Sequence, residues 1–97
     1  MSDLNSQILE EVFSIIKDRR DNPREGSYVS SLIRGGEDAI LKKVGEESAE
    51  VILAAKGGSK DDVVHEVADL IFHLMILLAY KWVEISEVFE ELARRRR

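Results

Sequence analysis

Apolar residues recur three and four positions apart along most of the chain, which is the spacing of one face of an α-helix. Pro23, Gly26 and the glycine pairs at 35–36 and 57–58 interrupt this pattern. No stretch alternates apolar and polar residues over a useful length, so no strand is expected. The pattern predicts an all-α protein with helices over 4–20, 27–33, 37–56, 59–80 and 86–97.

The first and third predicted helices are amphipathic, and their apolar stripes are expected to face the core. In the first helix the stripe comprises Leu4, Ile8, Val12, Ile15 and Ile16, widened by Leu9 and Phe13. In the third it comprises Ile40, Leu41, Val44, Val51, Ile52 and Ala55. Ser59 and Asp62 resemble a capping box at the start of the fourth helix, and Ser86 is expected to cap the last.

The fourth predicted helix decides the expected architecture. Between residues 70 and 79 only His73 is not apolar, and a helix that is apolar on every side must be buried on every side. The other helices of one domain over 1–97 are too short to wrap it. We therefore expect a long antiparallel helical hairpin plus shorter helices, with a four-helix-bundle-like core completed by homodimerisation. A monomer with an exposed apolar patch is the alternative.

Composition narrows the class of protein. The chain has 14 Lys and Arg against 19 Asp and Glu, a net charge of −5, which disfavours nucleic-acid binding. The absence of cysteine excludes disulfides and thiolate metal sites. The start of the chain does not resemble a secretory signal, and the apolar run is shorter than the roughly 20 residues of a membrane span. We expect a cytoplasmic protein with no membrane partner.

Two acidic pairs stand out on the third and fourth predicted helices. Glu47 and Glu50 are three positions apart, as are Glu66 and Asp69, so each pair lies on one face of its helix. If the chain reverses at the glycine pair 57–58, Glu47 lies opposite Asp69, and Glu50 lies opposite Glu66.

Converging carboxylates repel one another unless a cation or protons offset the charge. Oxygen ligands favour Mg²⁺, Mn²⁺ or Ca²⁺, and Mg²⁺ commonly binds substrate phosphates as well, so a phosphorylated substrate is implied. A di-iron site is disfavoured, because no Glu-x-x-His motif occurs at these positions. Solvated surface acids are the alternative. A phosphate-rich substrate also needs cationic groups, for which the candidates are Lys43, Lys42, Lys56 and Arg34.

The acidic pairs and their surroundings resemble a known family. Glu46-Glu47-x-x-Glu50 followed by Glu66-x-x-Asp69 is similar to the signature of the all-α nucleoside triphosphate pyrophosphohydrolase (MazG-like) superfamily. Within it, the segments 27–28, 43–47, 54–56, 68–74 and 85–92 resemble the phosphoribosyl-ATP pyrophosphatases of histidine biosynthesis. The resemblance implies a dimeric, Mg²⁺-dependent enzyme that cleaves phosphoribosyl-ATP to phosphoribosyl-AMP and pyrophosphate.

The resemblance also implies roles for individual residues. Glu47, Glu50, Glu66 and Asp69 would be the metal ligands, and Glu46 an accessory acid that positions water. Lys43 could instead form only an ion pair with Glu47. His73 is either a support for Asp69 or a satisfied core histidine, and Tyr28 either stacks on an adenine or caps the core. The alternatives for the whole chain are a housecleaning nucleotide pyrophosphatase with the same metal site and a non-catalytic helical dimer module.

Overall fold

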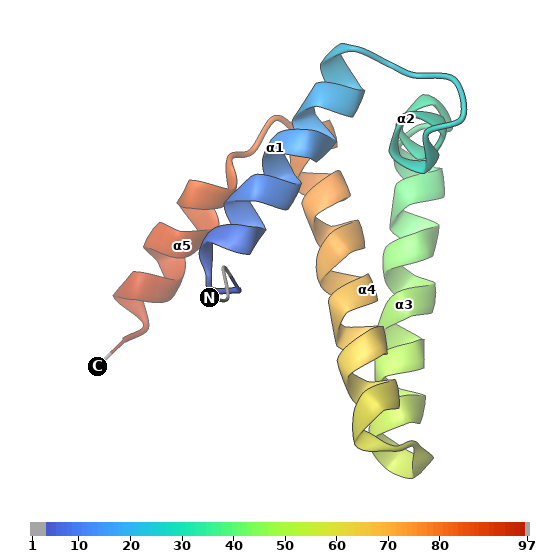
Figure 1. The fold of residues 1–97 in the computed structure, drawn as a ribbon, viewed down its shortest axis with the longest axis vertical. Coiled ribbons are helices and arrows are strands. Elements are labelled where there is room, and N and C mark those ends of the chain that lie inside the picture. The colour runs from blue at the N-terminus through green and yellow to red at the C-terminus, as the bar shows by residue number, and fades with distance from the viewer. Residues whose placement is uncertain (1–3, 97) are drawn as a thin grey trace.

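The computed structural model describes residues 4–96, and all regular structure within them is helical. The helices are α1 (Gln7–Asp21), α2 (Tyr28–Arg34), α3 (Glu37–Gly57), α4 (Lys60–Tyr80) and α5 (Ile85–Arg94). Helices α3 and α4 form a long antiparallel hairpin, α1 crosses the C-terminal half of α4, and α5 turns away beside α1 (Figure 1). The prediction of an all-α fold built on a long hairpin is confirmed.

The hairpin turn is where the sequence predicts it. Ser59 Oγ accepts a hydrogen bond from the Asp62 N–H at 3.2 Å, and Asp62 Oδ2 accepts one from the Ser59 N–H at 3.0 Å, so the predicted capping box is confirmed. A Cβ at Gly58 would lie 2.9 Å from both Ala54 O and Asp62 Oδ2. The chain therefore needs glycine at this point to turn tightly between α3 and α4.

Two predicted helix starts are wrong. Helix α1 begins at Gln7 rather than at Leu4, because the Asn5 side chain accepts the Gln7 N–H at 2.8 Å and satisfies that donor outside a helix. Helix α5 begins at Ile85, and its N-cap is Glu84 rather than Ser86. The Glu84 N–H donates to Glu87 Oε2 at 3.0 Å, which makes Glu87 the acidic partner at this terminus.

The core lies at the end of the hairpin away from Gly58. Every helix contributes a buried apolar side chain to it, and the set is Phe13, Ile16, Val29, Ile40, Met75, Ile76, Ala79 and Ile85. The stripe predicted for α1 is partly wrong, because Ile8 and Ile15 are exposed while Phe13 and Ile16 are buried. In α3, Leu41 and Ile52 are likewise exposed. Both helices therefore carry apolar side chains on a wider part of their surface than the other helices of the same chain bury.

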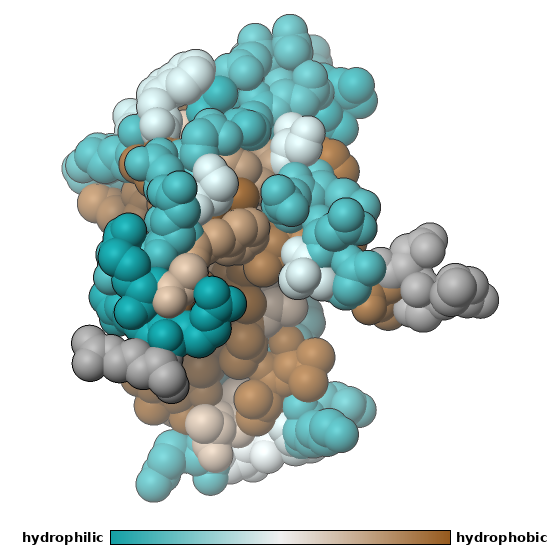
Figure 2. Space-filling view, turned by 90° about the vertical axis from the view of Figure 1, so that its left-hand side faces the viewer, coloured by the Kyte–Doolittle hydropathy of each residue, from teal (hydrophilic) through white to brown (hydrophobic). Residues whose placement is uncertain are grey.

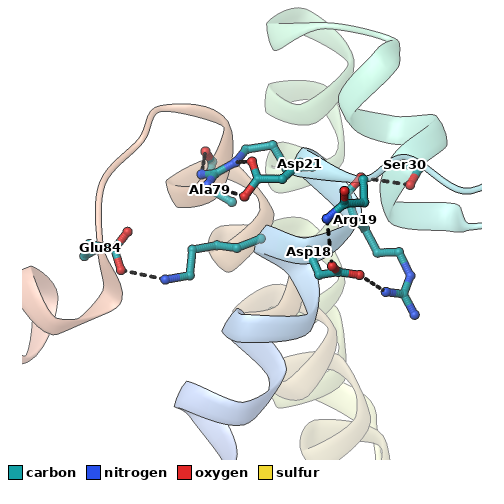
Figure 3. Close-up of polar contacts among 9 residues, drawn as sticks. Asp18, Arg19, Asp21, Ser30, Ala79 and Glu84 are labelled. Carbon is teal, nitrogen blue, oxygen red and sulfur yellow. Dashed lines mark hydrogen bonds and ion pairs between the residues drawn. The ribbon is translucent and has the colours of Figure 1, made fainter.

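Polar contacts fix α1 against its neighbours (Figure 3). The Ser30 hydroxyl of α2 donates to Arg19 O at 3.0 Å, and Arg20 Nη1 donates to Ala79 O at 2.8 Å, near the end of α4. The Arg20 guanidinium also stacks over the Trp82 ring, 3.4 Å from its centroid. These contacts hold the ends of α1, α2 and α4 together, so the start of α2 has a fixed position relative to the hairpin.

One long side of α4 is left uncovered. Among the described helices it alone is long and apolar enough to cross a membrane, with a mean hydropathy of 1.7, yet only 22% of that segment is buried within the chain. Its exposed side continues into an apolar groove of about 230 Å³ beside α1 and α5, visible as brown surface in Figure 2. The groove is lined by Leu9, Ile71, Leu74, Met75, Leu78, Ile85, Val88, Phe89 and Leu92. One chain therefore does not supply the all-round burial that the sequence predicts for this helix.

Candidate metal centre

A carboxylate occupies the face that α3 turns toward the rest of the protein. The buried residues of α3 are Ile40, Glu47 and Ala54, which are seven positions apart and so lie on one line along the helix. Glu47 is only 7% exposed, although acidic residues are almost never buried without a partner. This placement makes Glu47 the central residue of the candidate site.

Asp69 of α4 lies opposite Glu47, as the hairpin register predicts. One ligand atom each from Glu47, Asp69 and His73 lies within 4.8 Å of the other two. Burial raises the pKa of Glu47, and the charge and hydrogen bonding of Asp69 raise it further, while Lys43 and His73 act in the opposite direction. The ionised form of Glu47 is therefore disfavoured beside Asp69.

One oxygen of Glu47 has no partner. Its Oε2 is buried and is the one buried side-chain N or O atom in the described part of the chain that lacks a hydrogen bond. A buried acceptor without a donor is costly, and a cation beside it would remove that cost. The donor set of carboxylate oxygens suits a hard divalent ion such as Mg²⁺. The residues present therefore fit the metal that the sequence implies.

Glu66 joins the cluster through Asp69, and Glu50 does not. One ligand atom each from His65, Glu66 and Asp69 also lies within 4.8 Å of the others, so Asp69 belongs to both groups. Glu50 is exposed and belongs to neither group among the residues described. Asp69 thus lies near Glu47 in one group and near Glu66 in the other, and Glu50 stays a predicted ligand only.

The predicted cationic residues are placed unequally. Lys43 is half-buried, lies 3.7 Å from Glu46 Oε1 through its Nζ, and acts on the pKa of Glu47. The ion pair is thus formed with Glu46, three positions along, rather than with Glu47. Glu46 itself is exposed, one position before the buried Glu47. Lys42, Lys56 and Arg34 are also exposed, so their contacts with substrate stay predictions.

Tyr28 and His73 connect α2 to the carboxylates. The Tyr28 hydroxyl lies 2.7 Å from His73 Nε2, and His73 Nδ1 lies 2.8 Å from the backbone oxygen of Asp69. His73 is therefore both buried and in contact with Asp69, so each of its two sequence interpretations describes part of its role. The Tyr28 contact was missed, because it joins residues 45 positions apart and no local spacing marks it.

A shallow pocket of about 360 Å³ adjoins this connection. It is lined by Glu25, Gly26, Ser27, Tyr28, Ser31 and Arg34. Tyr28 is 49% exposed and forms one wall of the pocket, and its ring also contacts the buried ring of His73. Burial of part of the ring raises the pKa of the Tyr28 hydroxyl, Lys43 opposes this, and Asp69, Glu47 and Glu46 add to it. The hydroxyl thus keeps its proton at neutral pH.

Comparison with known proteins shows which family the chain is similar to. The phosphoribosyl-ATP pyrophosphohydrolase family matches residues 9–96. The chain is 46% identical over 92 residues to the phosphoribosyl-ATP pyrophosphatase of Geotalea daltonii, covering 95% of this chain and 87% of that protein. It is 49% identical over 94 residues to the enzyme of the same name from Methanocella arvoryzae, covering 95% and 99%.

A longer relative is similar over only part of its length. The histidine biosynthesis bifunctional protein of Caldanaerobacter subterraneus is 51% identical over 89 residues, which are 92% of this chain and 43% of that protein. The family match, from residue 9 to residue 96, includes both acidic helices. The carboxylate pair across the α3–α4 hairpin lies within this match. The chain therefore belongs to the phosphoribosyl-ATP pyrophosphohydrolase family.

Proposed function

We propose that this chain uses Mg²⁺ held between α3 and α4 to hydrolyse phosphoribosyl-ATP to phosphoribosyl-AMP and pyrophosphate, the second step of histidine biosynthesis. The reaction follows from the family, and the relatives named above carry the same activity in their names. The observation that supports the metal site is the unpartnered, buried Oε2 of Glu47 beside the Asp69 carboxylate.

Glu47, Glu66 and Asp69 would hold the ion, with Glu50 as a further ligand from the exposed side of α3. An ion held by these residues would supply positive charge to a bound triphosphate and polarise a phosphorus–oxygen bond. The carboxylates of this chain fix where that charge sits, because both helices are held by the tight turn at Gly58 and by the core at their other end. Positioning and charge stabilisation then provide most of the catalysis.

Glu46 is the proposed water-positioning residue. It is exposed and is not among the clustered ligand atoms, so its carboxylate, which pairs with Lys43, can still orient an attacking water and accept its proton. The water oxygen bonds to the α- or the β-phosphorus as the phosphoanhydride bond between these two breaks, which gives phosphoribosyl-AMP and pyrophosphate. Lys43, 3.7 Å from Glu46, supplies a positive charge at the same edge of the site for the phosphate oxygens. Lys42, Lys56 and Arg34 are further candidates for such contacts.

We infer that the working unit is a homodimer, in which a second copy covers the exposed side of α4 and the apolar groove. The exposed patch combines Val64, Val67, Ile71 and Leu74 with the groove residues of α5. An apolar surface of this continuity is typical of an obligate interface. The dimer would give α4 the burial that one chain does not. The net charge of −5 and the small-molecule substrate support a cytoplasmic enzyme without nucleic-acid or membrane partners.

Pyrophosphate release tests the proposal directly. Purified protein with Mg²⁺ and phosphoribosyl-ATP is expected to release pyrophosphate, and ATP or dUTP is expected to release much less. Glu66→Gln should abolish turnover, whereas Glu90→Gln, at an exposed position of α5, should leave it unchanged. Preference for an ordinary nucleoside triphosphate would indicate a housecleaning pyrophosphatase, and no cleavage of any nucleotide would indicate a binding module.

A further inference from the structure

We propose that Tyr28 and His73 form a hydrogen-bonded pair that positions Asp69 for the cation, and that His73 is not itself a metal ligand. The inference rests on the proposed metal site at Asp69. It concerns residues that no catalytic step above uses. His73 lies close enough to Glu47 and Asp69 for one of its nitrogens to be taken for a ligand atom. Its hydrogen bonds argue against that role.

The hydrogen bonds fix the tautomer of His73. A backbone carbonyl only accepts, so the nitrogen 2.8 Å from Asp69 O must carry the hydrogen, and that nitrogen is Nδ1. In the neutral ring, Nε2 is then an acceptor, and the Tyr28 hydroxyl 2.7 Å away donates to it. Nδ1 has no free lone pair, and the lone pair of Nε2 is engaged. Neither nitrogen is available to a metal ion.

The ring is held firmly in this orientation. His73 is only 3% exposed, and the rings of Tyr28 and Phe72 both contact it edge-on with centroids 5.7 Å away. Its Nδ1 also lies 3.6 Å from Asp69 Oδ1, one helical turn earlier. The imidazole thus contacts both the backbone and the carboxylate of the same ligand residue. Such outer contacts orient a ligating carboxylate and tune its affinity for the metal.

Tyr28 extends this support to a second helix. It is the first residue of α2, and the Ser27 side chain caps that helix by accepting the Ser30 N–H at 3.1 Å. The Ser30 hydroxyl in turn donates to Arg19 O of α1, so the position of Tyr28 is tied to the core. The charged groups around the pair are Lys43, Glu46 and Glu47 from α3 and Asp69 from α4. Through Tyr28, a wall of the pocket beside α2 is hydrogen-bonded to the metal site.

The tautomer is the first test, and it does not depend on activity. Two-dimensional ¹H–¹⁵N spectra of the imidazole nitrogens should show His73 with a protonated Nδ1 and an unprotonated Nε2 at neutral pH, before and after Mg²⁺ is added. A protonated Nε2, or an Nε2 resonance that changes to that of a metal-bound nitrogen when Mg²⁺ is added, would overturn the proposal.

Metal affinity is the second test. Tyr28→Phe removes the donor to His73 while keeping the half-exposed ring, so the variant should fold, whereas changes to the buried His73 risk the fold itself. Loss of an outer hydrogen-bonding partner lowers metal affinity by about 10–100-fold, and we expect Mn²⁺ binding, measured by electron paramagnetic resonance of the free protein, to weaken by about 10-fold. Tyr80→Phe is the matched control, because it removes the same oxygen from a half-buried tyrosine packed on the core.

The two variants separate positioning from folding. Tyr28→Phe should melt somewhat below wild type, because the buried Nε2 of His73 loses its donor. Mn²⁺ binding, measured well below the melting temperature, should weaken in Tyr28→Phe and stay unchanged in Tyr80→Phe. Equal Mn²⁺ affinity in wild type and Tyr28→Phe would overturn the pair's role, even if wild type releases pyrophosphate normally. Failure of wild type to release pyrophosphate, with Mn²⁺ binding still dependent on Tyr28, would instead contradict the proposed function and support the pair.

Discussion

Glu47 of α3 and Asp69 of α4 lie face to face across the hairpin, with ligand oxygens within 4.8 Å of each other. Both burial and the neighbouring carboxyl raise the pKa of Glu47, so its ionised form is disfavoured in the folded, metal-free chain. This arrangement does not stabilise the fold without a cation. A cation held there, as proposed, would offset this cost, and the cost can be measured.

Glu47→Gln is expected to stabilise the metal-free protein at neutral pH. The substitution keeps the shape of the side chain and removes the ionisation that burial and Asp69 disfavour. Each kcal/mol gained corresponds to a rise in melting temperature of about 4–8 °C for a domain of this size. The measurement is thermal unfolding in the presence of a chelator. Glu90→Gln, at an exposed position, is the control that should show no rise.

The stabilisation by Glu47→Gln should depend on pH with a definite sign. The pKa of Glu47 is raised in the folded state above its ordinary value of 4.5, so the folded carboxyl binds a proton more tightly than the unfolded one. Its favourable contribution is present below pH 4.5 and is lost as the pH rises through the folded pKa. The stabilisation of the variant over wild type should therefore be largest at neutral pH, should decrease on acidification, and should no longer change with pH well below 4.5. A difference that grows on acidification would contradict the assignment.

Mg²⁺ should make wild type more stable than the variants that lack a ligand carboxylate, Glu47→Gln included. A ligand that binds only the folded state stabilises it by about 2.7 kcal/mol at a hundred times its dissociation constant. Wild type should gain this in a melting experiment with Mg²⁺, and Glu66→Gln and Asp69→Asn should gain little. Glu50→Gln tests whether Glu50, the predicted ligand that lies outside the cluster, contributes to Mg²⁺ binding. A full Mg²⁺ response in that variant would remove Glu50 from the ligand set.

The hairpin and its acidic register could be predicted from the sequence, because both follow from helical spacing and one glycine turn. The turn at Gly58 and the constant rise per residue of a helix are enough to predict that Glu47 lies opposite Asp69. The start of α1 could not be predicted from apolar spacing, because it depends on the Asn5 side chain. The contact between Tyr28 and His73 depends on how α2 packs on α4, and no sequence period encodes that placement. Local patterns therefore predict helices and their faces, while the supporting contacts of the site are tertiary.

Lys43→Gln should impair the reaction more than it impairs folding. Lys43 is half-buried beside Glu46 and acts electrostatically on Glu47 and Tyr28, so its charge lies at the edge of the site. A hydrogen bond to a charged group contributes about 1.5–3 kcal/mol, and we expect kcat/KM to fall by about 10–100-fold. Lys60→Gln, at an exposed position in the first turn of α4, should leave kcat/KM unchanged. If Lys43→Gln and Lys60→Gln have the same kcat/KM, Lys43 serves only in its ion pair with Glu46 and does not contact the substrate.

Ile71→Glu tests whether a second copy covers α4. Ile71 lies on the exposed side of the helix and lines the apolar groove, so a carboxylate there would be buried without a partner in a dimer but solvated in a monomer. Light scattering after size-exclusion chromatography should show a dimer for wild type and a monomer for Ile71→Glu. Glu90→Lys also changes charge, but at an exposed position of α5 outside the groove, and should remain dimeric. A monomeric wild type would leave α4 exposed in solution and contradict the inferred assembly. If the dimer also supports the acidic centre, Ile71→Glu will bind Mn²⁺ more weakly although no ligand has changed.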